Sequence, residues 1–450
     1  MAFNDWNDAN PAVVPTGCAR CHSSTGYQDY LGADGSAAGV VDKAPPVGTV
    51  IDCAACHNAA TATLSSVTFP SGVEVKDLGA EARCMTCHQG RQSTVSVDTS
   101  IAKNADPNKP DAASEKLGFA NMHYFAAGAT QYGGITKGGY QYAGKAYDVK
   151  FAHVVGFDTC IDCHDQHSLE VRLEECAVCH PGAQKREDLK KIRMIASAHD
   201  YDGDGDVLEG VAGEIETLQA ALYAALQAYA TKAGAPIIYD SHSHPYFFKD
   251  TDANGKVDPN EAVSANQYKS WTPRLLKAAF NYQVSWKDPG AFAHNAKYII
   301  QLLFDSIEDL DATAVAKLTR DDAGHFAGAN EQWRHWDEDG KVSGGCSKCH
   351  CATGLPFFLQ EGVNASQPLS NGLMCTTCHN AMPEFTRYEV KTALFPSGAK
   401  LDTGNLDSNL CISCHQGRES TVSVNTKIAG LEPDTVSSKV TFSNVHYFAA

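Results

Sequence analysis

One short pattern, Cys-x-x-Cys-His, occurs eight times in this chain and uses sixteen of its seventeen cysteines. Two of the copies lie in a single loop, Asp158–Gly182, where they begin only sixteen residues apart. A chain that repeats two thiols and an imidazole at one fixed spacing must fold around whatever those groups bind. The copies are Cys18-Cys21-His22, Cys53-Cys56-His57, Cys84-Cys87-His88, Cys160-Cys163-His164, Cys176-Cys179-His180, Cys346-Cys349-His350, Cys375-Cys378-His379 and Cys411-Cys414-His415.

Three kinds of chemistry use paired cysteines: disulfide formation, zinc binding and covalent attachment of haem. Zinc takes four ligands in a tetrahedron, often from Cys-x-x-Cys units, but it does not require a histidine after every second cysteine. Disulfides do not require that histidine either. Haem attachment accounts for the whole pattern, because two thiols add to the two vinyl groups of one porphyrin and the next residue is its proximal imidazole. The motifs therefore predict eight haem c groups.

On these motifs the chain resembles the multihaem c-type cytochromes, and the resemblance covers both motif-bearing regions. The ratio is one haem for roughly 56 residues (450 divided by eight), which is too dense for each porphyrin to have its own protein core. We therefore expect the porphyrins to pack near one another and to form much of the interior. The expected fold class is mainly α with much irregular coil, in which two haem-packed arrays are joined by an all-helical calcium-binding insert.

The chain contains an internal duplication. The segment "CMTCHQGRQSTVSV" that begins at Cys84 recurs as "CISCHQGRESTVSV" from Cys411, and "NMHYFAA" from Asn121 recurs as "NVHYFAA" from Asn444. A repeat of this kind indicates two copies of one structural unit.

The duplication predicts three regions: a five-haem array at residues 1–183, a helical insert with EF-hand-like loops at 184–324, and a second array at 325–450 with three haems. Because the second array shows fewer motifs than the first, we expect a longer parent protein. That parent would carry two further motifs after residue 450 and an export signal before residue 1.

The second axial ligand of each iron sets its potential and its function. Eight of the eighteen histidines belong to motifs, and the ten that remain are enough to give every iron a second imidazole, whereas only six methionines exist. We therefore predict ligation by two histidines and low potentials. The predicted distal ligands are His123, His153, His167, His199, His294, His335 and His446, of which His123 and His446 occupy equivalent positions in the two arrays; the other three histidines are His242, His244 and His325.

The insert shows helical patterns. Charged residues predict a helix at Lys185–Ala198, and an apolar stripe predicts another at Leu208–Lys232. Pro273 suits the first turn of a third helix, where its missing N–H costs little. One long helix is expected after Pro289.

Two acidic loops lie in the same insert. Residues 250–261 fit the twelve-residue EF-hand loop, in which Gly255 makes the turn and the calcium ligands are Asp250, Asp252, Asn254, the carbonyl of Lys256, Asp258 and Glu261. A second loop has its acidic residues in the same register, but Val211 stands where the closing glutamate belongs, so Glu209 or Glu214 would have to substitute; its candidate ligands are Asp200, Asp202, Asp204 and Asp206. For both loops, the alternative is a solvated acidic turn without a metal ion.

Close haems with both axial positions filled predict electron transfer in periplasmic or extracellular respiration. The alternative is an oxidoreductase that keeps one iron open for substrate, as in the multihaem nitrite reductases and hydroxylamine oxidoreductases. The leftover thiol, Cys351, is expected to be a small buried residue, because that is the usual state of a free cysteine.

Composition and cofactor chemistry also bear on partners and location. A net charge of -17 argues against a nucleic-acid binder, and no apolar run is long enough to span a membrane. The expected partners are other redox proteins or an extracellular electron acceptor, with self-assembly into filaments as a further option. Haem is attached to c-type cytochromes outside the cytoplasmic membrane, and the high cysteine count also favours an oxidising compartment. An exported, periplasmic or extracellular protein is therefore expected.

Overall fold

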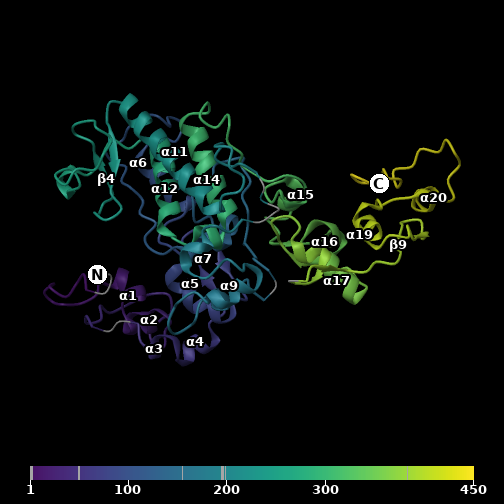
Figure 1. Cartoon of the computed structure of the whole chain (residues 1–450), viewed down its shortest axis with the longest axis horizontal. Coiled ribbons are helices and arrows are strands. Elements are labelled where there is room, and N and C mark those ends of the chain that lie inside the picture. Colours follow the sequence, from purple (N-terminus) through teal and green to yellow (C-terminus); the bar gives the residue numbers. More distant parts are fainter. Residues whose placement is uncertain are drawn as a thin grey trace. The chain divides into compact units, whose positions relative to one another are not determined.

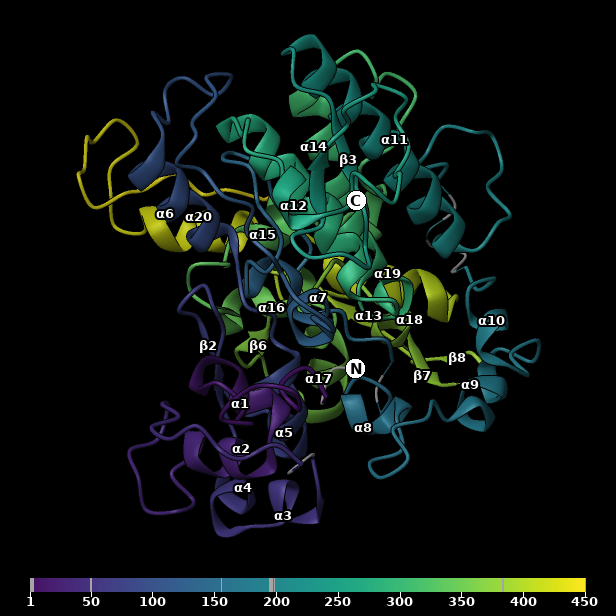
Figure 2. The same cartoon turned by 90° about the vertical axis from the view of Figure 1, so that its left-hand side faces the viewer.

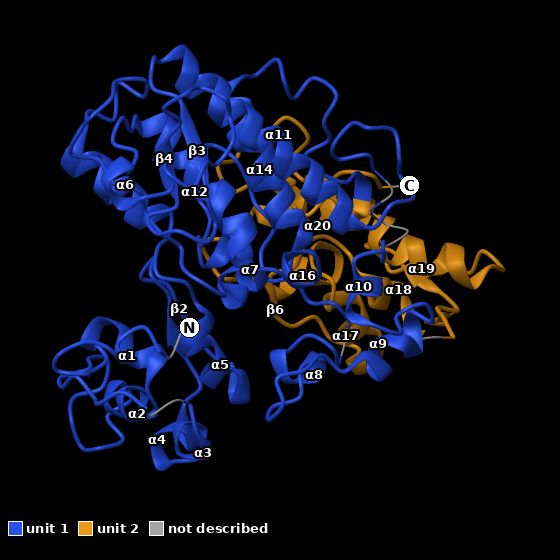
Figure 3. Ribbon diagram, turned by 60° about the vertical axis from the view of Figure 1, so that its left-hand side comes forward, with its two compact units in different colours: residues 1–324 blue, residues 325–450 orange. Residues whose placement is uncertain are grey.

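The computed structural model describes residues 4–48, 51–154, 156–193, 197, 199–382 and 384–449. The chain divides into two compact units, Met1–Gly324 and His325–Ala450 (Figure 3). Residues 184–324, the insert of the sequence analysis, belong to the same compact unit as the five-motif region. The three-region division itself stays a prediction.

Each of the eight cysteine motifs lies on a short helix. Cysteines three residues apart share one face of a helix, so the helical form aims both thiols in the same direction. In the first unit these helices are α1 (Thr16–His22), α3 (Cys53–Cys56), α5 (Ala82–His88), α8 (Cys160–Cys163) and α9 (Leu173–Cys179); in the second they are α16 (Gly344–His350), α18 (Cys375–Cys378) and α19 (Leu406–His415).

The longest helices of the first unit lie in the insert. They are α11 (Val211–Lys232), α12 (Pro273–Lys287) and α14 (Ala296–Leu310), and they pack on one another (Figures 1 and 2). The predicted apolar stripe of α11 is buried through Ile215, Leu218, Leu222 and Leu226, which confirms the expected helix. Pro273 is the first residue of α12, and the side chain of Thr272 accepts a hydrogen bond from the backbone N–H of Leu275.

The remaining helices are short. They are α2 (Ser24–Tyr30), α4 (Ala59–Thr63), α6 (Thr94–Asn104), α7 (Ala127–Tyr132), α10 (Arg186–Leu189), α13 (Ala291–His294), α15 (Glu331–Arg334), α17 (Gly354–Glu361) and α20 (Thr421–Ile428).

The described strands form five two-stranded antiparallel ladders. They are β1 (Val67–Thr68) with β2 (Glu74–Val75), β3 (Ile237–Tyr239) with β4 (Phe247–Lys249), β5 (Lys341–Val342) with β6 (Gln367–Pro368), β7 (His379–Ala381) with β8 (Thr386–Arg387), and β9 (Ala393–Leu394) with β10 (Lys400–Leu401). The protein is thus mainly helical with much coil and few strands, as expected. Within the described ranges, no helix combines the length and apolar character that crossing a membrane requires.

Three predictions about the insert are wrong. It is not all-helical, because β3 and β4 pair within it. In the charged stretch Lys185–Ala198, the described residues 185–193 are α-helical only in α10, and residues 194–196 and 198 lie outside the described residues. The long helix after Pro289 is two helices, because the backbone of Asn295 leaves the helical region (φ -171°, ψ 78°) and its side chain caps Tyr298 at the start of α14.

Buried amide side chains join the insert to the first array. Asn281 accepts a hydrogen bond from the backbone N–H of Tyr140 at 2.6 Å, and Gln283 accepts one from Met122 at 2.9 Å. Because an unpaired buried amide would cost free energy, these bonds specify how the helices meet the coil of the array. The insert and the array therefore share one core.

Candidate haem and calcium sites

None of the seventeen cysteines, all of which lie in the described part of the chain, forms a disulfide. Among the described residues, the groups of side chains placed to hold a metal ion consist of carboxylates and include no cysteine. Paired cysteines that converge on zinc would bring four sulfurs together. The structure shows no such group of four sulfurs among the described residues.

Five of the proximal histidines are oriented by a backbone carbonyl. In each of them Nδ1 lies within hydrogen-bond distance of the carbonyl oxygen, at 2.8–3.3 Å, and must donate because a carbonyl can only accept. A donor at Nδ1 leaves Nε2 as the nitrogen that can bind a metal. The pairs are His88 with Phe125, His164 with Leu169, His350 with Gln332, His379 with Phe385, and His415 with Phe448.

A second imidazole faces six of the eight proximal histidines. The centroids of the facing rings are 5.6–6.4 Å apart in the pairs His22–His123, His57–His167, His153–His180, His164–His294, His325–His415 and His350–His446. Two imidazoles on opposite sides of one metal ion, each bonded at ~2 Å, have centroids about 6 Å apart. The residues present therefore fit a bis-histidine haem at these six motifs.

The predicted distal ligands divide into two groups. His123, His153, His167, His294 and His446 each face a proximal histidine, as given above. His199 and His335 do not: the ring of His199 lies 6.5 Å from that of Tyr201, and the ring of His335 lies 4.8 Å from Trp336.

His325 is not among the distal ligands predicted from the sequence, but its ring faces that of His415 at 5.9 Å. His123 and His446 were found because each repeats the other, but His325 has no repeat partner in the sequence, so the duplication gave no signal for it. In the part of the chain that the structure describes, no second histidine ring faces His88 or His379.

The repeated "HYFAA" segments hold their histidines in the same way. His123 and His446 both have a left-handed backbone, with φ of 70° and 76°. The backbone N–H of each donates to the side chain of the asparagine two residues earlier, Asn121 at 3.0 Å and Asn444 at 2.9 Å. This asparagine turn explains why the duplicated motif begins with Asn: it bends the chain so that the imidazole reaches a distant motif.

Motifs that are distant in sequence touch one another within each unit. The Cys87 thiol donates to the carbonyl of Arg20 at 3.7 Å, and its repeat Cys414 donates to the carbonyl of Lys348 at the same distance. The side chain of Cys87 also lies within hydrogen-bonding reach of that of Cys21. Porphyrins attached at such motifs would therefore be neighbours.

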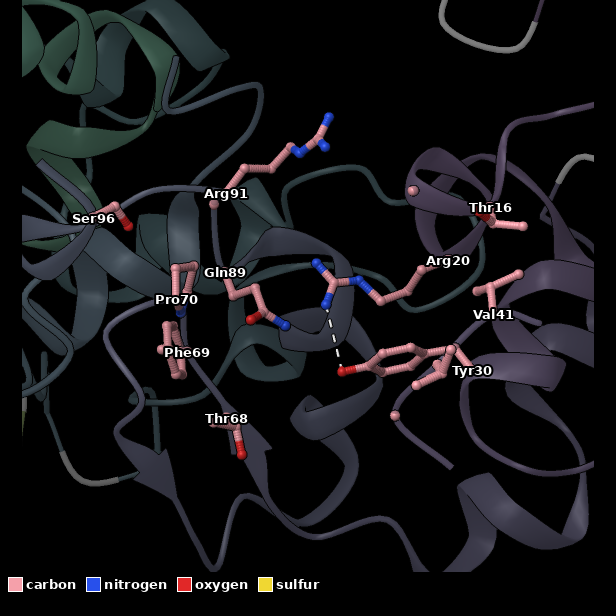
Figure 4. A pocket seen from close by; sticks show the side chains of 14 residues that line it. Thr16, Arg20, Tyr30, Val41, Thr68, Phe69, Pro70, Gln89, Arg91 and Ser96 are labelled. Atoms are coloured by element: carbon pink, nitrogen blue, oxygen red, sulfur yellow. Dashed lines mark hydrogen bonds between the residues drawn. The ribbon is translucent and has the colours of Figure 1, made fainter. Parts of the chain in front are cut away.

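A cavity of about 580 Å³ lies beside the first motif (Figure 4). Arg20 and Tyr30 line one side, with a hydrogen bond of 3.4 Å between them, and Gln89 and Arg91 follow the third motif. Its volume is in the range of cofactor pockets, and arginines suit the carboxylates of a porphyrin. The lining includes no motif cysteine or histidine, so the cavity lies beside the first and third motifs and is not itself a haem attachment site.

The EF-hand-like loop brings its carboxylates together. Ligand oxygens of Asp250, Asp252 and Glu261 all lie within 4.8 Å of one another, and Gly255 makes the turn at φ 74°. Glu261 is 2% exposed, and its Oε2 has no hydrogen-bond partner. A buried carboxylate oxygen without a partner is costly unless a cation binds there. Among the other predicted ligands, Asn254 donates to Asp258 at 3.0 Å, and the N–H of Lys256 donates to Asn254 at 2.7 Å.

The second acidic loop gathers its carboxylates in two overlapping groups. Oxygens of Asp200 and Asp202 lie near Glu214, and those of Asp202 and Asp204 lie near Glu209. Burial and the neighbouring carboxylates of Glu214 and Asp202 raise the pKa of Glu209 to about 7. Glu214 also pairs with Arg193, which already neutralises it. Asp206 lies outside both groups and accepts backbone hydrogen bonds from Leu208 and Glu209.

Cys351 is fully buried, and its thiol donates to the carbonyl of Ser347 at 3.0 Å. Burial raises the pKa of this thiol, so little of it is in the reactive thiolate form. This is the small buried residue that the sequence predicts.

The comparisons with known proteins agree with this chemistry. Residues 3–89 match the family model of cytochrome c7 and related cytochrome c. The chain is 29% identical over 359 residues to the C-type polyheme cytochrome OmcB of Geobacter sulfurreducens (strain DL-1 / KN400), which covers 65% of this chain and 43% of the relative. It is 28% identical over 373 residues to the C-type polyheme cytochrome OmcC of Geobacter sulfurreducens (strain ATCC 51573 / DSM 12127 / PCA), which covers 68% of this chain and 43% of the relative.

The chain spans less than half the length of these curated relatives, and no solved structure matches it. Polyheme relatives and the paired imidazoles lead to the same result: the chain is a multihaem c-type cytochrome.

Proposed function

We propose that this protein carries electrons along a series of eight covalently attached haem c groups, most of them bound by two histidines. The observation that carries the proposal is the set of six facing imidazole pairs, whose centroid separations of 5.6–6.4 Å match a metal ion bound between two rings. A haem supplies an iron that takes up and releases one electron. With histidines on both sides of that iron, no position is left for a substrate.

The contacts between motifs support the same function. Cys87 lies against the first motif and Cys414 against the sixth, and the backbone N–H of Cys160 donates to Glu81, which adjoins the third motif, at 3.1 Å. These contacts would hold successive cofactors side by side. Closely spaced cofactors with filled axial positions suit electron transfer more than substrate conversion.

Haem counting and spectroscopy of the haem-loaded protein test this proposal. The pyridine haemochrome assay is expected to give eight haems per chain, and the oxidised spectrum is expected to be dominated by low-spin iron. A count of one haem or none would overturn the assignment. A mostly high-spin spectrum would overturn ligation by two histidines and would favour an enzyme with open irons.

We also propose that calcium binds the loop of residues 250–261, with Asp250, Asp252, Asn254, Asp258, Glu261 and the carbonyl of Lys256 as ligands. The loop of Asp200, Asp202, Asp204 and Asp206 is the second candidate, with Glu209 closing it, because the buried Oε1 of Glu209 has no hydrogen-bond partner. Both ions would be structural, since the loops carry no redox group.

The setting we propose is exported, in the periplasm or outside the cell, in respiration. The partners would be other redox proteins or an extracellular electron acceptor. Attachment of haem c outside the cytoplasmic membrane supports this location. Fractionation of the native host, with the protein followed by haem staining, tests it, and electron microscopy of the purified protein tests whether copies assemble into filaments.

A further inference from the structure

A buried carboxylate holds one of the facing histidines. Nδ1 of His294 lies 2.9 and 2.8 Å from the two carboxylate oxygens of Asp288. Asp288 directly follows α12, and His294 is the last residue of α13. The Asp288 residue is only 2% exposed, and the backbone N–H of Gly290 donates to its Oδ1 at 3.1 Å. The carboxylate is therefore held in place from its own turn and aimed at the imidazole.

This arrangement differs from the carbonyl contacts described above. A carbonyl is a neutral acceptor, whereas Asp288 places a full negative charge at Nδ1, and hydrogen bonds to charged groups are stronger. The neighbouring cation does not cancel that charge by direct contact, because Nζ of Lys287 lies over the rings of Tyr124 and Tyr246, at 3.3 and 4.1 Å. Among the salt bridges of the described residues, Asp288 pairs with His294.

The imidazole of His294, which Asp288 holds, faces the proximal histidine of the fourth motif. The ring of His294 faces that of His164 at 6.4 Å, and Nδ1 of His164 points to the carbonyl of Leu169 at 3.3 Å. Because Asp288 occupies Nδ1 of His294, Nε2 is left for a metal on the side of His164.

We propose that Asp288 is a positioning residue that lowers the reduction potential of the haem held between His164 and His294. The inference rests on the proposed function, since it requires that His294 bind this iron. A carboxylate that draws the Nδ1 proton of an axial imidazole makes Nε2 a stronger donor, and second-shell hydrogen bonding of this kind tunes the potential. The stronger donor and the buried negative charge both favour Fe(III) over Fe(II). The helical insert would thus tune a haem that is attached to the first array.

Redox titration of the haem-loaded protein tests this. The substitution Asp288→Asn keeps the shape of the side chain and its hydrogen bond with His294 but removes its negative charge. We expect one eighth of the haem absorbance to titrate at a higher potential, by at least about 59 mV, which is a tenfold change for a one-electron couple. Asp288→Glu, which keeps the carboxylate, should return the potential toward that of the wild type.

The matched control is Asp158→Asn. Asp158 lies two residues before Cys160, pairs with Lys150 at 3.5 Å and has a side chain that is 37% exposed. This variant loses the same charge beside the same motif without touching a histidine, so its titration should match that of the wild type.

The outcomes separate the inference from the function on which it rests. A wild-type titration curve in Asp288→Asn, with eight haems per chain and a spectrum dominated by low-spin iron, would overturn the inference and leave the proposed function standing. So would an equal shift in Asp158→Asn, because net charge would then explain the effect. If His294→Ala shows no high-spin iron, His294 is not the ligand and the inference fails. A wild-type protein without haem c would overturn the proposed function itself.

Discussion

At the scale of single residues, two histidines that lie ten positions apart, His325 and His335, illustrate how the fold selects a ligand. His325 begins the second unit and faces His415, whereas His335 follows α15 and has Nδ1 3.0 Å from Glu331 on the same turn. Its side chain is 61% exposed. The backbone of residues 325–335 therefore presents the imidazole of His325 to the eighth motif and that of His335 to solvent.

Replacing each of these histidines gives a direct test. In His325→Ala, one of the eight haems should lose its second imidazole and become high-spin, which electron paramagnetic resonance of the oxidised protein would detect. His335→Ala is the matched control and should keep the low-spin spectrum. The reverse result would show that His335, which is among the distal ligands predicted from the sequence, binds one of the three irons of the second unit and that His325 does not.

At the scale of elements, the loop of residues 250–261 brings the carboxylates of Asp250, Asp252 and Glu261 close together. Glu261 accepts hydrogen bonds from the backbone and side chain of Thr251 through Oε1, which holds the carboxylate toward Asp250 and Asp252. These bonds lower the pKa of Glu261, so it is charged at neutral pH. Three crowded carboxylates without a counter-ion repel one another, and calcium would relieve that repulsion.

Removing this charge should weaken calcium binding. In Glu261→Gln we expect the calcium affinity of the haem-loaded protein to fall at least about tenfold, or ~1.4 kcal/mol, because the closing ligand of an EF-hand loop is bidentate. Isothermal titration calorimetry, on protein first treated with a chelator to remove calcium, measures this affinity.

The matched control for that variant is Glu216→Gln. Glu216 pairs with Lys190 on the surface of α11, with a side chain that is 58% exposed, so calcium binding should be unchanged. Equal affinities in Glu261→Gln and the wild type would contradict the site.

At the scale of the whole molecule, apolar side chains are distributed unevenly. A large apolar cluster joins the insert helices to the segment 67–147 of the first array. The region of the first motif has a cluster of only three buried residues, Val14, Ala19 and Val41, and the second unit has another of three, Leu355, Val390 and Leu410. Such small clusters cannot offset the conformational entropy of the surrounding coil, so these regions need another source of stability.

Haem should be that source. In protein made without haem attachment, hydrogen exchange at α11, α12 and α14 should remain at least ~100-fold slower than at α1, α18 and α19, because only the former have an apolar core of their own. Haem-loaded protein is the control, and there the motif helices should also be protected. Protection of α1, α18 and α19 without haem would show that side chains alone hold these regions.

The sequence by itself determined three features that depend on neighbours along the chain. The spacing of Cys18, Cys21 and His22 defines one haem attachment, the apolar stripe of α11 defines its buried face, and the oxygens of residues 250–261 define an acidic turn, because in each case the interacting groups are adjacent in sequence. Only the tertiary structure decided which residues that are distant in sequence lie face to face. His164 meets His294, and His325 meets His415, across segments whose paths depend on packing, and the break at Asn295 that lets α13 turn away from α14 has no periodic signal. A ligand pair of this kind is formed by the whole fold, so the choice between His325 and His335 could not be read from local pattern.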